Sequence, residues 1–187
     1  MDSRVSTEAA GSATQYLTFS LMGEEYAVGI LKVREILEYD VVTRVPRAPA
    51  WVRGAINLRG RVVPVVDLAV RFGMPPQEIS PRTCIVILDL AAFETASVVG
   101  ILVDSVSQVV ELLAADISPA PSFGTKVRTD DLVGVAAMGK KFALILDVDR
   151  VLSSTEAESL GAAVEASAAE ELVPPAETPS EQKEVSQ

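Results

Sequence analysis

Histidine is absent from the 187 residues, and cysteine occurs once, as Cys84. Without histidine, the chain can form neither Ser-His-Asp or Cys-His catalysis nor a histidine-based metal site. A single cysteine also excludes an intrachain disulfide and a thiolate zinc site. Because Cys84 lies in the apolar run TCIVILDL, we predict a buried core cysteine there rather than a reactive thiol.

Long apolar runs are missing as well. No stretch of the chain reaches the roughly 18 apolar residues that a transmembrane helix needs. The first residues, MDSRVSTEAAGSATQ, lack the basic start and the apolar centre of a secretory signal. Together with the single cysteine, these features predict a cytoplasmic protein.

Positive charge is in deficit, and the net charge is −10. Residues 156–187 carry eight glutamates and one lysine, whereas residues 15–155 have a net charge of only −2. We predict a disordered arm over residues 1–14, one domain over residues 15–155, and an acidic, largely disordered tail over residues 156–187. Nucleic acid is not an expected partner, because Arg53, Arg59 and Arg61 form at most a small basic group in an acidic chain.

One segment matches the pattern of a phosphate-binding loop. GVAAMGKK, residues 134–141, fits G-x-x-x-x-G-K, but Lys141 stands where Ser or Thr would hold magnesium. The next residues, FALILDV, are typical of a strand and not of the helix whose amide groups would face the phosphates. We therefore expect a β-hairpin here, and we expect no cofactor and no metal.

The domain is predicted to be mainly β. YLTFSLM alternates in polarity, GEE follows as a turn, and YAVGIL continues as a second strand. Further strand-length apolar runs are RVVPVVDL, TCIVILDL, ASVVGILVDSV and FALILDV. Short helical turns are expected at residues 48–54 and 68–73, and Trp51 is expected to be a packing anchor.

Two sequence echoes predict two related β subdomains. VGIL occurs at residues 28–31 and again at 99–102, a shift of 71. GAINLRGRVVPVVDL, residues 54–68, has a counterpart in GVAAMGKKFALILDV, residues 134–148, a shift of 80. Short strands that close on themselves leave no free edge, so two small barrels are the expected architecture.

The first hairpin raises the question of what its arginines do. In INLRGRVV, Arg59 and Gly60 can form a two-residue turn in which Gly60 takes a positive φ. Alternation then places Arg59 on the face opposite Leu58. Pro64 cannot donate to a ladder and predicts an edge strand or a bulge. The sequence alone leaves Arg59 either as a docking residue or as a solvated charge at the hairpin tip.

The chain closely resembles the CheW family of coupling proteins in bacterial chemotaxis. The resemblance covers residues 15–154 and is carried by ILKVREI, TRVPRAPAWVRGAINLRGRVVPVVDL, VVGILVDSV and LVGVAAMGKKFALILDVDRVL. It implies two five-stranded, SH3-like β-barrels packed about a third apolar core, and no catalytic activity. It also implies two partners, namely the helical hairpin tip of chemoreceptors, between the barrels, and the regulatory domain of the histidine kinase CheA. The resemblance implies a free protein that is monomeric and is recruited to membrane-associated receptor arrays.

The resemblance also indicates which residues contact partners. These are Val33, Glu35, Gly54, Asn57, Arg59, Ile85, Val106, Val109 and Gly134. Some have a structural explanation that stays open at this point. Gly54 and Gly134 can be required by backbone geometry alone, and Ile85, Val106 and Val109 can be core residues.

Two other functions remain as alternatives. The first is a CheW-like coupler of a chemosensory array that does not serve motility. The second is a small-ligand-binding β-barrel, which would require a sizeable pocket with converging polar groups.

Overall fold

A computed structural model describes residues 12–90, 98–121, 124 and 126–152. Its strands are β1 (Thr14–Leu21), β2 (Glu24–Gly29), β3 (Val33–Glu38), β4 (Val52–Leu58), β5 (Arg61–Asp67), β6 (Cys84–Asp89), β7 (Val98–Val103), β8 (Ser105–Leu112), β9 (Ile117–Ser118), β10 (Leu132–Met138) and β11 (Lys141–Leu146). The helical segments are short: η1 (Ile30–Lys32), α1 (Leu68–Arg71), η2 (Ala114–Asp116), η3 (Thr129–Asp131) and α2 (Val148–Val151). The predictions for an N-terminal arm and an acidic tail fall outside the described residues, except that β1 already begins at Thr14.

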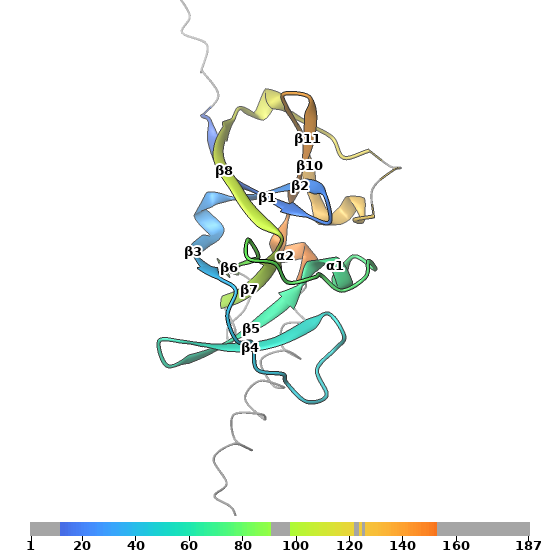
Figure 1. Ribbon diagram of the computed structural model, residues 1–187. Helices are drawn as coiled ribbons and strands as arrows, with labels where there is room; N and C mark the ends of the chain where they lie inside the picture. Colours follow the sequence, from blue (N-terminus) through green and yellow to red (C-terminus); the bar gives the residue numbers. More distant parts are fainter. Residues whose placement is uncertain (1–11, 91–97, 122–123, 125, 153–187) are drawn as a thin grey trace, which may run out of the picture.

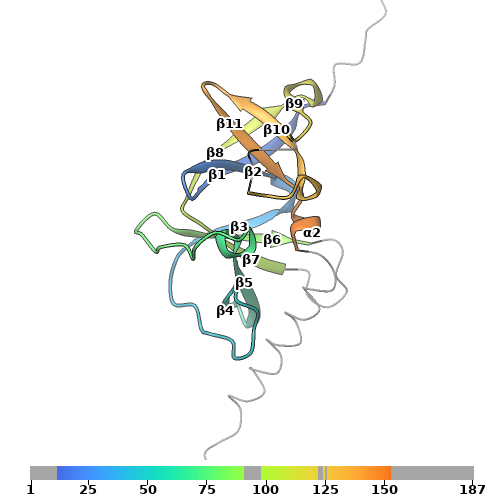
Figure 2. The ribbon, with the colours of Figure 1, turned by 90° about the vertical axis from the view of Figure 1, so that its right-hand side faces the viewer.

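The strands form two sheets, one above the other in Figures 1 and 2. The upper sheet has six strands in the order β8-β1-β2-β11-β10-β9, and the lower sheet has five in the order β3-β6-β7-β5-β4. The prediction of a mainly β protein with two subdomains is confirmed. The upper sheet differs from the expected five strands by β9, which is only two residues long.

The chain changes sheets twice. After β1 and β2 it leaves the six-stranded sheet through η1, builds the whole five-stranded sheet, and returns through β8. The two sheets have equivalent strand orders: β8, β1, β2, β11 and β10 of the six-stranded sheet correspond in turn to β3, β6, β7, β5 and β4 of the five-stranded sheet. The first hairpin of each sequence half lies in one sheet and the remaining strands of that half lie in the other.

The sequence echoes correspond to equivalent strand pairs. β4 pairs with β5 from Val52↔Val66 to Leu58↔Arg61, and β10 pairs with β11 from Leu132↔Leu146 to Met138↔Lys141, with the irregularity at the same place. The shift is 80 at every position of the register. The same holds for the shift of 71, which carries the Tyr16↔Gly29 pair of β1 and β2 onto the Ile87↔Gly100 pair of β6 and β7.

Three apolar clusters hold the fold together. The largest lies between the sheets and includes Phe19, Leu21 and Tyr26 from one sheet and Val86 and Ile101 from the other. A smaller cluster belongs to each sheet alone, around Ala27, Leu112, Ala136, Ala143 and Ile145 in one and around Val63, Val65, Ile85, Ile87 and Leu102 in the other. This arrangement agrees with the third core that the resemblance implied. Among the described residues, buried apolar side chains pack together within each sheet.

Pro64 predicted either an edge strand or a bulge in its own strand, and neither is found. β5 lies inside its sheet, between β7 and β4, and the irregularity is on β4 between Val52 and Gly54. Pro64 is tolerated because Ala55, opposite it, exchanges both backbone hydrogen bonds with Thr43 (2.8 and 2.9 Å), so β4 requires no N–H from Pro64.

The remaining local predictions are partly confirmed. Residues 134–141 form the β10–β11 hairpin in place of a nucleotide loop, and α1 lies within residues 68–73. No helix forms at residues 48–54, where turns lead directly into β4. Trp51 packs against the central cluster, with the Arg71 guanidinium 5.7 Å from its ring centroid. Cys84 is only half-buried, because it lies at the first position of β6.

Candidate functional site

The tip of the β4–β5 hairpin is a two-residue turn. Arg59 and Gly60 both have positive φ, 51° and 84°, which is the backbone of a type I′ turn. Asn57 stabilises this turn, because its Oδ1 accepts a hydrogen bond of 2.9 Å from the Gly60 N–H. Ile56 and Leu58 face the core of the five-stranded sheet, so the predicted alternation is confirmed.

Arg59 meets Glu35 across the sheet. Arg59 Nη2 lies 3.1 Å from Glu35 Oε2, with side-chain exposures of 80% and 20%. Glu35 is on β3 and Arg59 follows β4, and these strands form opposite edges of the five-stranded sheet. The sheet therefore curls until its edges approach, and the ion pair joins them.

A surface cavity of about 280 Å³ surrounds this pair. Its polar lining is Arg34, Glu35, Arg59 and Arg61. Arg34 pairs with Asp89 of the neighbouring strand at 3.4 Å, whereas Arg61 has no carboxylate partner within the described part of the chain. The cavity is thus lined by guanidinium groups, the Glu35 carboxylate and the apolar side chains of Leu58, Val63 and Val98.

A second group of predicted residues lies along the seam between the sheets. Val33 of β3 and Val106 of β8 are half-buried and pack against the central cluster, whereas Val109 of β8 is 50% exposed. Both strands are sheet edges, and both views place β8 above β3. The sequence did not indicate Leu31, which is 93% exposed in η1 directly before β3. The seam therefore offers apolar side chains beside two strand edges.

The other predicted residues are not exposed. Ile85 is 2% exposed and packs within the core of the five-stranded sheet. A β-carbon on Gly54 would lie 2.2 Å from the Thr43 carbonyl oxygen, and one on Gly134 would lie 2.6 Å from that of Ser118. The structural explanation accounts for the residue type at these three positions, and their part in partner binding stays a prediction.

The described residues show little that is typical of a catalytic centre. They contain no group of three or more Cys, Asp or Glu placed to hold a metal ion, and no helix long and apolar enough to cross a membrane. Burial, together with the charge and hydrogen bond of Glu24, raises the pKa of the Tyr26 phenol, which lies in the central cluster. For contact with a partner, this surface offers guanidinium groups, the Glu35 carboxylate and the apolar side chains of the seam.

The fold and this surface define an interaction module made of two β subdomains. Residues 15–156 match the family model of the CheW-like domain. The chain is 39% identical over 154 residues to chemotaxis protein CheW of Klebsiella aerogenes, covering 82% of this chain and 89% of the relative. It is 30% identical over 124 residues to protein FrzA of Myxococcus xanthus, covering 65% and 74%.

A solved structure has the same architecture. Scaffolding protein TtCheW from Thermoanaerobacter tengcongensis aligns with a TM-score of 0.69 at 28% identity, covering 80% of this chain and 94% of that one. The chain belongs to the CheW family of chemotaxis scaffold proteins, which confirms the resemblance found in the sequence.

Proposed function

We propose that this protein is a non-catalytic cytoplasmic adaptor that couples the tips of chemoreceptors to the histidine kinase CheA. The observation that carries the proposal is the Arg59–Glu35 pair, which joins two sheet edges at positions that the sequence resemblance assigns to partner binding. Arginine suits this role, because its planar guanidinium has five donors and it is enriched among binding hot spots.

The receptor contact is assigned to the seam between the sheets. Leu31, Val33 and Val109 supply apolar surface there, which suits one face of an amphipathic helix lying in the seam. The kinase contact is assigned to the outer surfaces of the two subdomains, where a regulatory domain of the same fold would dock subdomain to subdomain. Residues 15–155 are proposed to be the unit that makes both contacts.

Co-sedimentation tests this function. Receptor-containing membranes should pellet the protein by themselves, and CheA should pellet with the membranes in an amount that depends on added protein. Failure of CheA to pellet in the presence of saturating protein would contradict a coupling role.

A second candidate keeps the same physical mechanism. The match to protein FrzA, whose name differs from those of the chemotaxis CheW relatives, favours considering a chemosensory system other than chemotaxis. A pull-down from the native cell distinguishes the two, because it identifies the receptors that bind.

A further inference from the structure

One segment of the chain carries positive charges only. Residues 41–66 contain five arginines and no other charged residue, although the whole chain has a net charge of −10. These arginines are Arg44, Arg47, Arg53, Arg59 and Arg61. The segment forms the loop before β4, β4 itself and most of β5, at the lower end of the molecule in Figure 1.

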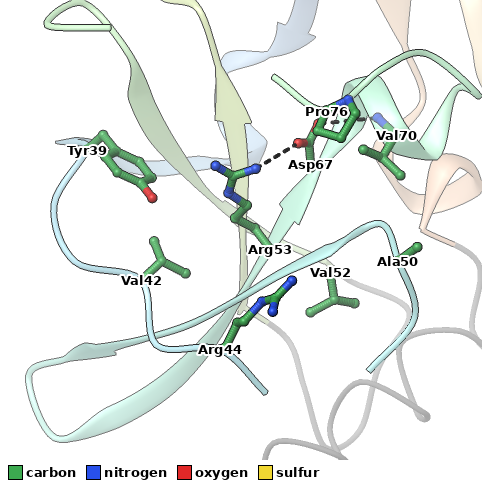
Figure 3. Close-up of a pocket in the computed structure, with 9 residues that line it drawn as sticks. All are labelled: Tyr39, Val42, Arg44, Ala50, Val52, Arg53, Asp67, Val70 and Pro76. Carbon is green, nitrogen blue, oxygen red and sulfur yellow. Dashed lines mark hydrogen bonds and ion pairs between the residues drawn. The ribbon is translucent and has the colours of Figure 1, made fainter. Parts of the chain in front are cut away.

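Two of these arginines line a cavity that the proposed function does not use. The cavity has a volume of about 370 Å³ and is lined by Tyr39, Val42, Arg44, Ala50, Val52, Arg53, Asp67, Val70 and Pro76. The Thr43–Ala55 bridge holds the Arg44 backbone beside β4. Figure 3 shows the Arg53 guanidinium directed to Asp67 on one side of the cavity and Arg44 below it.

Asp67 does not neutralise the cavity. Its Oδ1 accepts a hydrogen bond of 3.2 Å from the Val70 N–H and its Oδ2 accepts one of 3.1 Å from the Gln77 N–H, whereas Arg53 Nη1 lies 3.8 Å away. Arg44 has no carboxylate partner among the residues that the structure describes. Two guanidinium groups and one carboxylate leave a net positive charge, and a forked guanidinium is suited to a second carboxylate.

The last described residues before the acidic segment lie near this cavity. The Val151 carbonyl oxygen, at the end of α2, accepts a hydrogen bond of 3.2 Å from Arg71 Nε. Arg71 follows Val70, which lines the cavity. Residues 153–187 continue from this point, and residues 156–187 carry eight glutamates against one lysine. An extended chain spans about 3.3–3.6 Å per residue. The segment after Leu152 is therefore long enough to extend from the end of α2 to the cavity.

We propose that the cavity between Arg44 and Arg53 is a carboxylate site whose occupant is the chain's own glutamate-rich segment, residues 156–187. Tethering raises the effective concentration of those carboxylates to the order of millimolar, so weak individual ion pairs suffice for occupancy. The site uses none of the residues named above for the receptor contact. Its consequence is that an acidic partner has to displace this segment before it reaches the arginine end of the five-stranded sheet.

The test uses the full-length protein and a synthetic peptide of residues 156–187. In one variant, the eight glutamates of the segment are replaced by glutamine, so the tethered segment has no carboxylate to place in the cavity. Peptide binding is followed by the amide resonances of Val52 and Val70, which line the cavity. We expect the peptide to shift these resonances in the glutamine variant and to bind the wild-type protein about tenfold more weakly, because the tethered segment competes.

A matched pair of arginine variants locates the site. In the glutamine variant, Arg44→Gln should weaken peptide binding about threefold or more, whereas Arg82→Gln should not. Arg82 is exposed and lies outside the cavity, so its replacement removes the same charge elsewhere. Arg53 is left unchanged because it faces the buried Asp67. Equal peptide affinity for wild type and the glutamine variant, or equal weakening by both arginine replacements, would overturn the proposal.

Discussion

Gly54 lies against the backbone of Thr43, so that a β-carbon on the glycine would fall 2.2 Å from the threonine carbonyl oxygen. Thr43 bridges Ala55, the next residue of β4. In the other sheet, Gly134 has the same relationship to Ser118, which pairs with Val135. The sixth strand of the upper sheet is therefore the counterpart of a single bridge in the lower one.

Gly54→Ala should destabilise the protein by more than about 2 kcal/mol. The new methyl group would meet main-chain atoms that hold a bridge, and the φ of 153° is unfavourable for alanine. Gly29→Ala is the matched control, because a β-carbon there would have no neighbour within 4 Å. Urea unfolding of both variants measures the difference. Equal stabilities would show that Gly54 is not required by the backbone.

The equivalence of the two sheets could be predicted from the sequence, but the exchange of strands could not. The shifts of 71 and 80 follow from local patterns, namely the strand that ends in VGIL and the Gly-to-Asp hairpin. Which hairpin joins which sheet is decided by the central cluster, where residues such as Phe19 and Val86 pack together. That contact joins parts of the chain far apart in sequence, and no local pattern indicates it.

The site was predicted unevenly for a similar reason. The two-residue turn follows from Arg59-Gly60, and the alternation of Leu58 follows from period two, whereas the positive φ of Arg59 was not predicted. Leu31, in contrast, occupies the same place in its VGIL echo as Leu102, yet the first is 93% exposed and the second is buried. A change of backbone at η1, where the chain crosses between sheets, turns Leu31 outward, and the sequence echo conceals that difference.

Stability should fall at high pH because of Tyr26. Its folded-state pKa is raised, first by burial and then by Glu24, so the stabilisation is complete below the unfolded pKa of about 10 and is lost as the pH rises above it. Urea unfolding at pH 8 and pH 11 measures the loss, with Tyr26→Phe as the control. Wild type should lose more stability between these pH values than the variant, which has no phenol to ionise. Parallel losses would contradict this account.

Leu31→Asp should weaken receptor binding without destabilising the fold. Leu31 is almost fully exposed, so a carboxylate there costs little in the free protein but would be buried against the proposed receptor helix.

Val33→Asp should weaken binding by roughly 2 kcal/mol or more, and it should also lower stability because Val33 packs on the central cluster. Sedimentation with receptor-containing membranes and circular dichroism give the two readouts. Unchanged sedimentation of Leu31→Asp would remove this residue from the receptor surface.

Arg59→Asn separates the role of the guanidinium from that of the turn. Asparagine tolerates positive φ better than arginine, and Asn-Gly is a favoured type I′ pair, so the hairpin should remain intact. The exposed ion pair with Glu35 is worth about 0–1 kcal/mol, so the free energy of unfolding should change by no more than about 1 kcal/mol. Arg82→Asn is the matched control, because Arg82 is exposed and lies outside the cavity around the Arg59–Glu35 pair. We expect Arg59→Asn alone to lose most receptor-stimulated kinase activity in a reconstituted array.

A double-mutant cycle of Arg59→Asn with Glu35→Ala then shows how the arginine acts. If the arginine contacts a partner directly, the two losses of activity should add. If instead it shapes the binding edge by holding Glu35, the second replacement should cost little after the first, because the pair is already broken. The 3.1 Å contact with Glu35 supports the second route, whereas the 80% exposure of the Arg59 guanidinium supports the first. Wild-type kinase activity in Arg59→Asn would show that Arg59 is a solvated charge at the end of a turn.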